Sequence, residues 1–368
     1  MMPYVLHDRS QIITPALVVF RDLVAANLQQ MIAGDAARLR PHCKTHKMPA
    51  VAAMELAAGI TKHKCATLAE AEMLATAGVR DIFLAYNPVG ANVGRVVAFR
   101  RKFPDVNFLV AADHPVPVAE LSAACAASDV EVGVVLDLDC GMHRTGIQPG
   151  EKAMELYRMI DDAPHLIAAG LHAYDGHHHQ HDFAERAAAI DRDWRAVEAF
   201  RDQLAAAGLP TPRLIATGTP GFPVHARRSD PTLELSPGTT VFHDAGSLAN
   251  FPDLPFTPAA VVLSRVVSRP AADLVTFDAG TKAIAADPPM EKRAVFPELP
   301  DARIVAHNEE HLVIRTAEAK RFQPGDEQFI IPWHICPTVA WHREAYVAAD
   351  GAIVDRWPIV ARDRVLSL

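Results

Sequence analysis

Short apolar runs rich in β-branched residues alternate with stretches of helical character over the first two thirds of the chain. Eight runs span 16–20, 37–42, 62–67, 81–86, 107–112, 131–139, 167–174 and 213–217, and 232–242 is a candidate ninth. This alternation is typical of parallel strands joined by crossover helices. It predicts an α/β fold built on a (β/α)8 TIM barrel, with either the first or the last run outside the barrel.

The remaining third of the chain has a different pattern of apolar and polar residues. After residue 254 the apolar runs are short and alternating (259–267, 274–277, 311–316, 345–347), which predicts antiparallel β-structure. Asp350 and Gly351 predict a hairpin turn. We therefore expect a barrel domain over 1–254, whose first strand can join the second domain, and a C-terminal antiparallel β-domain over 255–368. The chain of 368 residues is long enough to bury both cores.

Composition narrows the class of partner. Thirty-six basic and 44 acidic residues give a net charge of −8, so no basic field is available for nucleic acid or an anionic membrane. No apolar run is long enough to span a bilayer, and residues 1–10 lack the apolar core of a signal peptide. Five cysteines, an odd number spread thinly, fit a reducing compartment. We expect a soluble cytoplasmic protein that acts on a small molecule.

A lysine follows shortly after the second apolar run. Lys44 lies within the segment RPHCKTHK at 40–47, and the carboxyl ends of barrel strands form the active face. Neighbouring Arg40, His42, His46 and Lys47 would discourage protonation of this lysine, as a Schiff-base lysine requires. On spacing alone a solvated basic loop is the competing interpretation.

A second centre is His334-Ile335-Cys336. If residues 329–336 form a strand, the period of two points His334 and Cys336 to the same face, where imidazole and thiolate could bind zinc or another divalent ion. On the residues alone, a packed histidine beside a buried cysteine is the alternative.

Seven further motifs follow the lysine segment in order along the chain. They are HKCAT (63–67), GMHRTG (141–146), GLHAYDGH (170–177), TGTPGFP (217–223), SPGT (236–239), NEEH (308–311) and PWHICPT (332–338). Together with RPHCKTHK they resemble the D-threonine aldolase and D-serine dehydratase family, pyridoxal-phosphate enzymes of the alanine racemase-like fold (fold type III), and most of all its D-threonine aldolase subgroup.

The resemblance implies roles for the matched residues. Lys44 would bind pyridoxal 5′-phosphate covalently and act at Cα of the substrate. Arg144 would contact the phenolic oxygen of the cofactor or the substrate carboxylate, and Tyr174 would lie against the pyridine ring. The full set of candidate cofactor-binding residues is Lys44, His42, Arg144, Tyr174, Thr217, Gly218, Thr219, Ser236, Gly238 and Thr239. Ser236 departs from alanine racemases, which place an arginine before this Pro-Gly pair, facing the pyridine nitrogen.

The same resemblance implies that His334 and Cys336 hold a divalent metal ion (Zn, Mn or Mg). The second ligand is cysteine in D-serine dehydratases and commonly aspartate in D-threonine aldolases. His177, His178, His179 and His181 follow Tyr174 and are candidates for the base that takes the β-hydroxyl proton, with His181 named among the catalytic candidates.

Two activities fit this family. We expect a D-threonine aldolase that cleaves β-hydroxy-D-amino acids, such as D-threonine and D-allo-threonine, to glycine and an aldehyde. Cys336 favours the alternative, a D-serine dehydratase that yields pyruvate and ammonia. A non-catalytic pyridoxal-phosphate carrier is the alternative of another class. Relatives with this fold form head-to-tail dimers, so we expect a homodimer, and the sequence leaves open whether His334 and Cys336 act in cis or in trans.

Overall fold

The structure of the protein is a computed structural model that describes residues 3–33 and 35–368. Residues 1–2 and 34, which fall within the predicted barrel domain, lie outside the described residues. The chain divides into two compact units. The barrel unit comprises residues 32–44, 49–238 and 363–368, and the sheet unit comprises 1–31, 45–48 and 239–362.

The barrel unit is built on a parallel sheet whose strands run in the order β2 to β8. Its strands are β2 (Lys62–Cys65), β3 (Asp81–Leu84), β4 (Asn107–Ala112), β5 (Val132–Leu138), β6 (Leu166–Ala173), β7 (Leu214–Ala216) and β8 (Leu233–Leu235). Residues 39–42 fill the remaining position, because Leu39 bridges Leu235 of β8 and His42 bridges Lys64 of β2, both in parallel. The predicted α/β class with a parallel barrel is therefore confirmed.

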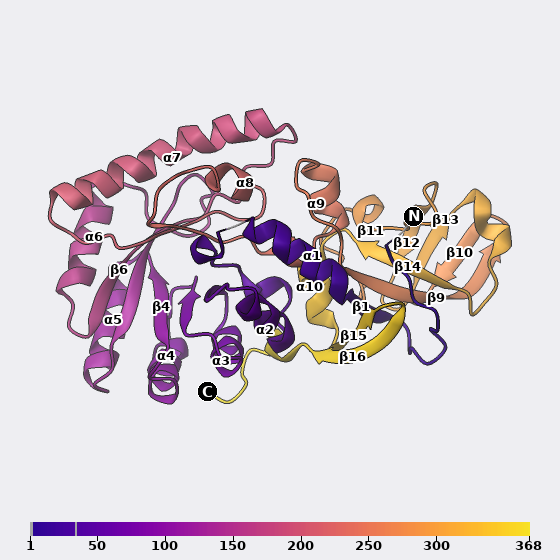
Figure 1. Cartoon of the computed structure of the whole chain (residues 1–368), viewed down its shortest axis with the longest axis horizontal. Helices are drawn as coiled ribbons and strands as arrows, with labels where there is room; N and C mark the ends of the chain where they lie inside the picture. The colour runs from indigo at the N-terminus through magenta and orange to yellow at the C-terminus, as the bar shows by residue number, and fades with distance from the viewer. Residues whose placement is uncertain (1–2, 34) are drawn as a thin grey trace. The chain divides into compact units, whose positions relative to one another are not determined.

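Helices connect these strands. They are α2 (Pro49–Ala57), α3 (Leu68–Thr76), α4 (Ala91–Lys102), α5 (Pro115–Ala126), α6 (Glu151–Asp162), α7 (Phe183–Ala206) and α8 (Phe222–His225), with 3₁₀ turns η1 (Ala36–Arg38) and η2 (Cys43–Thr45). Figure 1 shows α4 to α7 packed on the outside of β4 and β6. Gly78 follows α3 with φ +101°, the left-handed conformation that commonly ends a helix.

The strands of the barrel have apolar sequences because both of their faces are covered. All seven residues of β5 are buried, as expected for parallel strands with helices outside and side chains inside. Phe83, Leu109, Val135 and Ile215, from four different strands, meet in one interior cluster. Packed side chains fill this part of the barrel, so chemistry is left to the ends of the strands.

The sheet unit holds a mixed sheet in the order β12-β13-β10-β9-β1-β15-β16, with β14 pairing both β9 and β11. Its strands are β1 (Ala16–Phe20), β9 (Ala260–Ala271), β10 (Leu274–Phe277), β11 (Ala294–Val295), β12 (Arg303–His307), β13 (Leu312–Arg315), β14 (Glu327–Pro332), β15 (Glu344–Ala349) and β16 (Ala352–Pro358). Its helices include α1 (Arg21–Ile32), α9 (Ala245–Asn250) and α10 (Ile335–Trp341), with the 3₁₀ turn η3 (Thr239–Val241).

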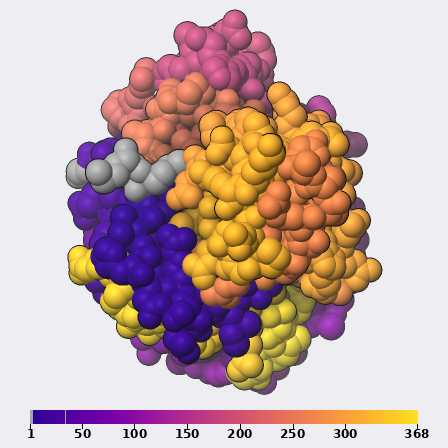
Figure 2. Space-filling model, turned by 90° about the vertical axis from the view of Figure 1, so that its right-hand side faces the viewer, coloured from indigo at the N-terminus to yellow at the C-terminus, as the bar shows by residue number. Residues whose placement is uncertain are grey.

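The first apolar run belongs to this sheet and not to the barrel. β1 pairs antiparallel with β9 and parallel with β15, so the sheet is mixed where a purely antiparallel one was predicted. In Figure 2 the N-terminal part of this unit, in indigo, lies beside its orange and yellow later strands. The first strand therefore joins the second domain, the alternative that the sequence left open, and the chain crosses between the two units at more points than 254/255 alone.

The hairpin predicted at Asp350 and Gly351 is present. β15 and β16 pair in antiparallel register on either side of it. Both turn residues have positive φ, +50° and +76°, as a two-residue hairpin turn of type I′ requires.

No helix among the described residues is long and apolar enough to cross a membrane.

Candidate functional site

Lys44 lies where the sequence predicted it, at the carboxyl end of the segment that closes the barrel. Residues 39–42 run between β8 and β2, and the chain then turns in η2, which carries Lys44. The backbone N–H of Lys44 donates to His42 Nδ1 at 3.2 Å. Lys44 is half-buried.

A second lysine, which we did not single out from the sequence, lies inside the barrel. Lys64 on β2 is buried, and its Nζ lies 2.7 Å from Nε2 of His172 on β6. The other ring nitrogen of His172, Nδ1, lies 2.6 Å from Oδ1 of Asp137 on β5. These side chains form a continuous polar chain, Lys64–His172–Asp137, across the barrel interior.

Burial and neighbouring positive charges shift the pKa values of Lys64, His172 and Asp137. Burial, followed by the positive charge of Lys44, lowers the pKa of Lys64 to about 7. Burial and Lys64 together lower the pKa of His172. Burial opposes ionisation of Asp137, but His172 and Lys64 hold the pKa of this carboxyl below its usual range. Lys64 therefore exchanges its proton near neutral pH, close to the candidate cofactor lysine.

Arg144 and Tyr174 come together at the same end of the barrel. The Arg144 guanidinium carbon lies 5.2 Å from the centroid of the Tyr174 ring, and Lys64 Nζ lies 5.4 Å from it. A small cavity is lined by Asp137, Leu138, Asp139, Met142, Arg144, Thr145 and Tyr174. Asp139 accepts hydrogen bonds from His143 and the Gly141 backbone.

The loops that carry the candidate cofactor-binding residues at 217–219 and 238 are also brought together. The Gly238 N–H donates to Thr219 Oγ1 at 3.2 Å, which links the loops after β8 and β7. Thr217 is fully buried with φ +69°, an uncommon conformation for a β-branched residue that is often found at functional sites. At Gly218 a Cβ atom would lie 2.9 Å from the Tyr174 ring, so only glycine fits there.

Asp175, just after β6, holds the loop that follows β7 by hydrogen bonds. It accepts from the Gly218 N–H at 3.2 Å and from Thr217 Oγ1 at 3.3 Å, and its Oδ2 lies 2.9 Å from His225 Nε2. Burial opposes ionisation of Asp175, but hydrogen bonds from His225 and Thr217 hold its pKa below the usual range. The loop is thus tied to an ionised carboxylate inside the barrel unit.

Ser236 follows β8 directly. Its hydroxyl is buried and has no hydrogen-bond partner among the described residues. A buried hydroxyl without a partner is costly, so it is expected to meet a polar atom of a ligand. With Lys44, Arg144, Tyr174 and the glycine at 218, this hydroxyl makes the barrel mouth a chemical fit for pyridoxal phosphate.

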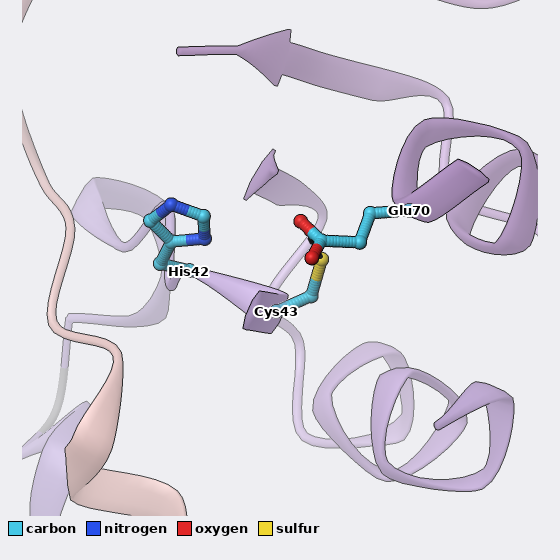
Figure 3. Close-up of side chains that lie close together, drawn as sticks. All are labelled: His42, Cys43 and Glu70. Atoms are coloured by element: carbon cyan, nitrogen blue, oxygen red, sulfur yellow. Dashed lines mark hydrogen bonds between the residues drawn. The ribbon is translucent and has the colours of Figure 1, made fainter. Parts of the chain in front are cut away.

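His42, Cys43 and Glu70 are close enough to be considered as metal ligands. Figure 3 shows the Cys43 sulfur against the Glu70 carboxylate, with the His42 ring to one side. Glu70 Oε2 already accepts from the Ala66 N–H at 2.6 Å and from Cys43 at 3.8 Å, and His42 Nδ1 accepts from Lys44 N–H. We read this group as hydrogen bonding that holds the Lys44 turn in place.

The histidines after Tyr174 divide into two kinds. His177 and His178 are largely or fully buried and lie near Asp193 of α7, whereas His179 and His181 are exposed. The backbone carbonyls of Gln180 and His181 accept from the Arg186 guanidinium. His181, the candidate base, therefore lies on an anchored loop with its side chain open to solvent.

The strand predicted over 329–336 is wrong at its end. β14 stops at Pro332, His334 is the N-cap of α10, and Cys336 lies in the first turn of that helix. The reason is Pro337, which lacks an N–H and therefore suits the first turn of a helix better than a strand. His334 and Cys336 nevertheless remain hydrogen-bonded neighbours.

The surroundings of this pair within the sheet unit fit a metal centre. Asp287 Oδ2 lies 2.6 Å from His334 Nδ1, the carboxylate–histidine arrangement that orients metal-binding imidazoles. Burial lowers the pKa of His334, but Cys336 and Asp287 outweigh it and raise the pKa to about 9. Cys336 Sγ also lies 3.1 Å from Thr45 Oγ1 and 3.9 Å from Thr239 Oγ1.

Asp244 supports the same turn. It caps α9 through the Ser247 N–H and accepts from the Ile335 N–H at 3.1 Å. Burial raises the pKa of Asp244. The hydrogen bond from the Ile335 N–H to Asp244 thereby fixes the backbone between His334 and Cys336.

Sequence reasoning missed Lys64, His172, Asp175 and Asp287 as site residues. For Lys64 a signal existed, since a lysine in the middle of a short barrel strand must either be buried with partners or disrupt the strand. For Asp287 no local pattern was available, because it lies 47 residues before His334 in an irregular segment.

Comparison with known families supports the architecture. Residues 22–245 match the family described as alanine racemase, N-terminal domain. Residues 259–348 match a serine dehydratase domain. These two matches account for most of the chain, one for most of the barrel and one for most of the sheet after it.

Similar proteins share this arrangement over nearly their whole length. The chain is 31% identical to a D-threonine aldolase of an Arthrobacter species, covering 95% of this chain and 92% of the relative. It is 28% identical to a 3-hydroxy-D-aspartate aldolase of Paracoccus denitrificans, covering 97% and 94%. It is also 28% identical to a D-threo-3-hydroxyaspartate dehydratase of a Delftia species, covering 92% and 95%.

Solved structures agree with this result. The D-threonine aldolase from Filomicrobium marinum superposes with a TM-score of 0.89 at 28% identity, covering 96% of each chain. A D-threo-3-hydroxyaspartate dehydratase variant, solved in a metal-free form, gives a TM-score of 0.84 at 25% identity, covering 95% of this chain and 97% of that one.

Proposed function

Because this chain belongs to the D-threonine aldolase and D-serine dehydratase family of alanine racemase-like, pyridoxal-phosphate-dependent lyases, we propose that it cleaves β-hydroxy-D-amino acids to glycine and an aldehyde. D-threonine and D-allo-threonine are the substrates we expect. The observation that carries the proposal is the grouping of Lys44, Lys64, Arg144 and Tyr174 at one end of the barrel.

We assign the cofactor contacts as follows. Lys44 would hold pyridoxal phosphate covalently, and the Ser236 hydroxyl would meet the pyridine nitrogen. Thr219, in the loop that Asp175 and the Gly238 N–H hold in place, would contact the phosphate through its hydroxyl and backbone. Bound in this way, the cofactor supplies an electron sink for bonds broken at Cα.

The chain's own residues then position the substrate and move its protons. Arg144 would bind the substrate carboxylate, because its guanidinium is held over Tyr174 and is available as a charge-assisted donor. In the cleavage of D-threonine the Cα–Cβ bond breaks, the hydroxyl proton leaves with a base, and Cα is reprotonated. We propose Lys44 as the group that returns the proton at Cα and His181 as the base for the hydroxyl.

We further propose that His334 and Cys336 bind a divalent metal ion, with Asp287 orienting His334. A thiolate and an imidazole favour zinc over magnesium or manganese. The ion would supply Lewis acidity toward the β-hydroxyl of the substrate.

A dehydratase is the second candidate, and one residue favours it. Cysteine at position 336 is the ligand type that the resemblance associates with D-serine dehydratases. In that reaction Lys44 would remove the Cα proton and the β-hydroxyl would leave, giving pyruvate and ammonia from D-serine. Higher identity to the D-threonine aldolase than to the dehydratase (31% against 28%) supports the aldolase.

Product analysis separates the two reactions. Purified protein loaded with pyridoxal phosphate is incubated with D-threonine or D-serine, with and without a chelator. We expect glycine and acetaldehyde in equal amounts from D-threonine, and loss of activity with chelator. Pyruvate and ammonia from D-serine as the dominant products would favour the dehydratase, whereas racemised substrate would contradict both.

We also propose that the protein works as a homodimer in the cytoplasm. Light scattering coupled to size-exclusion chromatography should give twice the mass of one chain. A monomer with full activity would contradict the dimer.

A further inference from the structure

Two adjacent histidines and an aspartate form a compact cluster between the end of β6 and helix α7. His177 and His178 lie on the segment after β6, and Asp193 lies on α7. His177 Nε2 lies 3.4 Å and His178 Nε2 lies 3.3 Å from the same oxygen, Asp193 Oδ2. The two imidazole rings are tilted by 40° to each other, with their centroids 4.0 Å apart.

Hydrogen bonding accounts for only part of this cluster. A charge-assisted N–H···O bond is about 2.7–2.9 Å long, whereas His177 Nε2 makes a long hydrogen bond of 3.4 Å to Asp193 and the contact of His178 at 3.3 Å is not a hydrogen bond. His178 is only 2% exposed, and its Nε2 has no hydrogen-bond partner among the described residues. Buried imidazole nitrogens of this kind call for a missing ion or water.

The spacing of the three ligand atoms is that of a metal centre. Zinc binds imidazole nitrogen and carboxylate oxygen at about 2.0–2.1 Å in tetrahedral geometry, so neighbouring ligand atoms lie about 3.3 Å apart. The two measured separations match this edge length, and one ligand atom from each of the three residues lies within 4.8 Å of the others. We propose that His177, His178 and Asp193 bind a first-row divalent transition ion of the zinc class.

The surroundings of the cluster suit a cation with one open position. Arg192 Nε holds the other oxygen of Asp193 at 3.1 Å, which leaves Oδ2 directed at the histidines. Gly141 lies against the His177 ring, where a Cβ would come within 2.9 Å of Nε2. Three protein ligands leave the fourth tetrahedral position to water or an anion.

Such an ion would tie the segment after Tyr174 to the long helix α7. The segment carries Tyr174 at one end and Asp182, the N-cap of α7, at the other. The bound ion would therefore hold Tyr174, and the side of the barrel mouth where it lies, in place. The residues differ from His334 and Cys336, and the assignment does not rest on the proposed lyase reaction.

Metal counting on the pyridoxal-phosphate-loaded protein tests the site. The background is His334→Ala, which removes the other proposed centre. Tag-free protein is stripped with chelator and dialysed against Zn²⁺ or Co²⁺, and bound metal is measured per chain. We expect one ion per chain in this background and none when His178→Ala is added. Asp193→Asn should weaken binding roughly 100-fold, and the exposed His179→Ala should leave it unchanged.

The spectrum of bound Co²⁺ identifies the ligands. A nitrogen and oxygen site gives d–d bands without a thiolate charge-transfer band. No ion in the His334→Ala background, an equal number of ions after His178→Ala, or a thiolate band would each overturn the proposal. The visible band of the lysine-bound cofactor and the thermal unfolding midpoint confirm that each variant is folded.

Discussion

Lys64 is buried inside the barrel although lysine is among the residues least often found there. Its pKa falls from 10.5 to about 7 through burial and the charge of Lys44. The unfolded chain binds this proton up to about pH 10, whereas the folded protein releases it near 7. The resulting destabilisation is absent above pH 10.5 and grows as the pH falls, until it is complete below about 7.

We therefore predict that the free energy of unfolding of the apoprotein rises between pH 7 and 10 by up to about 1.4 kcal/mol per pH unit because of Lys64. Lys64→Met should remove that part of the slope. Denaturant unfolding across this range measures it. The matched control is Lys62→Met, which removes a half-buried lysine of the same strand that pairs with Glu234 and should retain the slope. An unchanged slope in Lys64→Met would show that Lys64 is not the titrating group.

Ser236 gives a second prediction for a single residue. Because its hydroxyl has no partner among the described residues, Ser236→Ala should change the free energy of unfolding by less than about 0.5 kcal/mol. It should weaken pyridoxal phosphate binding about tenfold, the value of one hydrogen bond. Titration of apoprotein with the cofactor measures this. Ser122→Ala, which loses a bond to Pro164 on the barrel exterior, should bind normally, and equal affinities for the two variants would refute the assignment.

Single site residues could be predicted from the sequence where a motif contains them. They could not be predicted where only the packing of distant segments brings them together. Lys44, Arg144 and the threonines at 217 and 219 could be named because ordered motifs carry them. The partner of Lys64 could not be named, since His172 is 108 positions away and meets it only when the barrel closes.

The loop between β7 and α8 depends on Asp175 of the preceding strand end. Asp175→Ala would leave His225, Thr217 and the Gly218 amide without their shared acceptor in a buried place. We predict a loss of about 3 kcal/mol in the free energy of unfolding and weaker cofactor binding. Asp191→Ala, which removes an exposed partner of Arg228, should cost less than about 0.5 kcal/mol. Urea unfolding of both variants decides, and similar losses would contradict the anchoring role.

Strands were predicted correctly where the alternation of apolar and polar residues was clear. The positions at which they end were predicted less well. The strands at 274–277 and 345–347 and the hairpin at Asp350 were confirmed. The strand over 329–336 was too long, because the alternation of His334 and Cys336 also fits the start of a helix, and Pro337 decides in favour of the helix.

For the whole molecule, the class of fold followed from the alternation of strands and helices. The sequence also allowed the first run to join the second domain, as it does, but it did not indicate which strands that run would pair with. β1 lies more than 300 residues from its parallel partner β15, and a local pattern carries no information about such pairing. The same limit applies to function, since residues far apart in sequence build the barrel mouth. Membership of the family identifies the cofactor as pyridoxal phosphate, which the residues alone do not.

The central claim is that Lys44 carries pyridoxal phosphate in this enzyme, with Lys64 as a neighbour whose pKa is lowered to about 7. Reduction of the loaded protein with borohydride fixes the cofactor to the lysine that holds it, and peptide mass mapping identifies that lysine. We predict the pyridoxyl group on Lys44 alone, and none after Lys44→Ala. A pyridoxyl group on Lys64 in the unmodified protein, or no labelled lysine at all, would contradict the account.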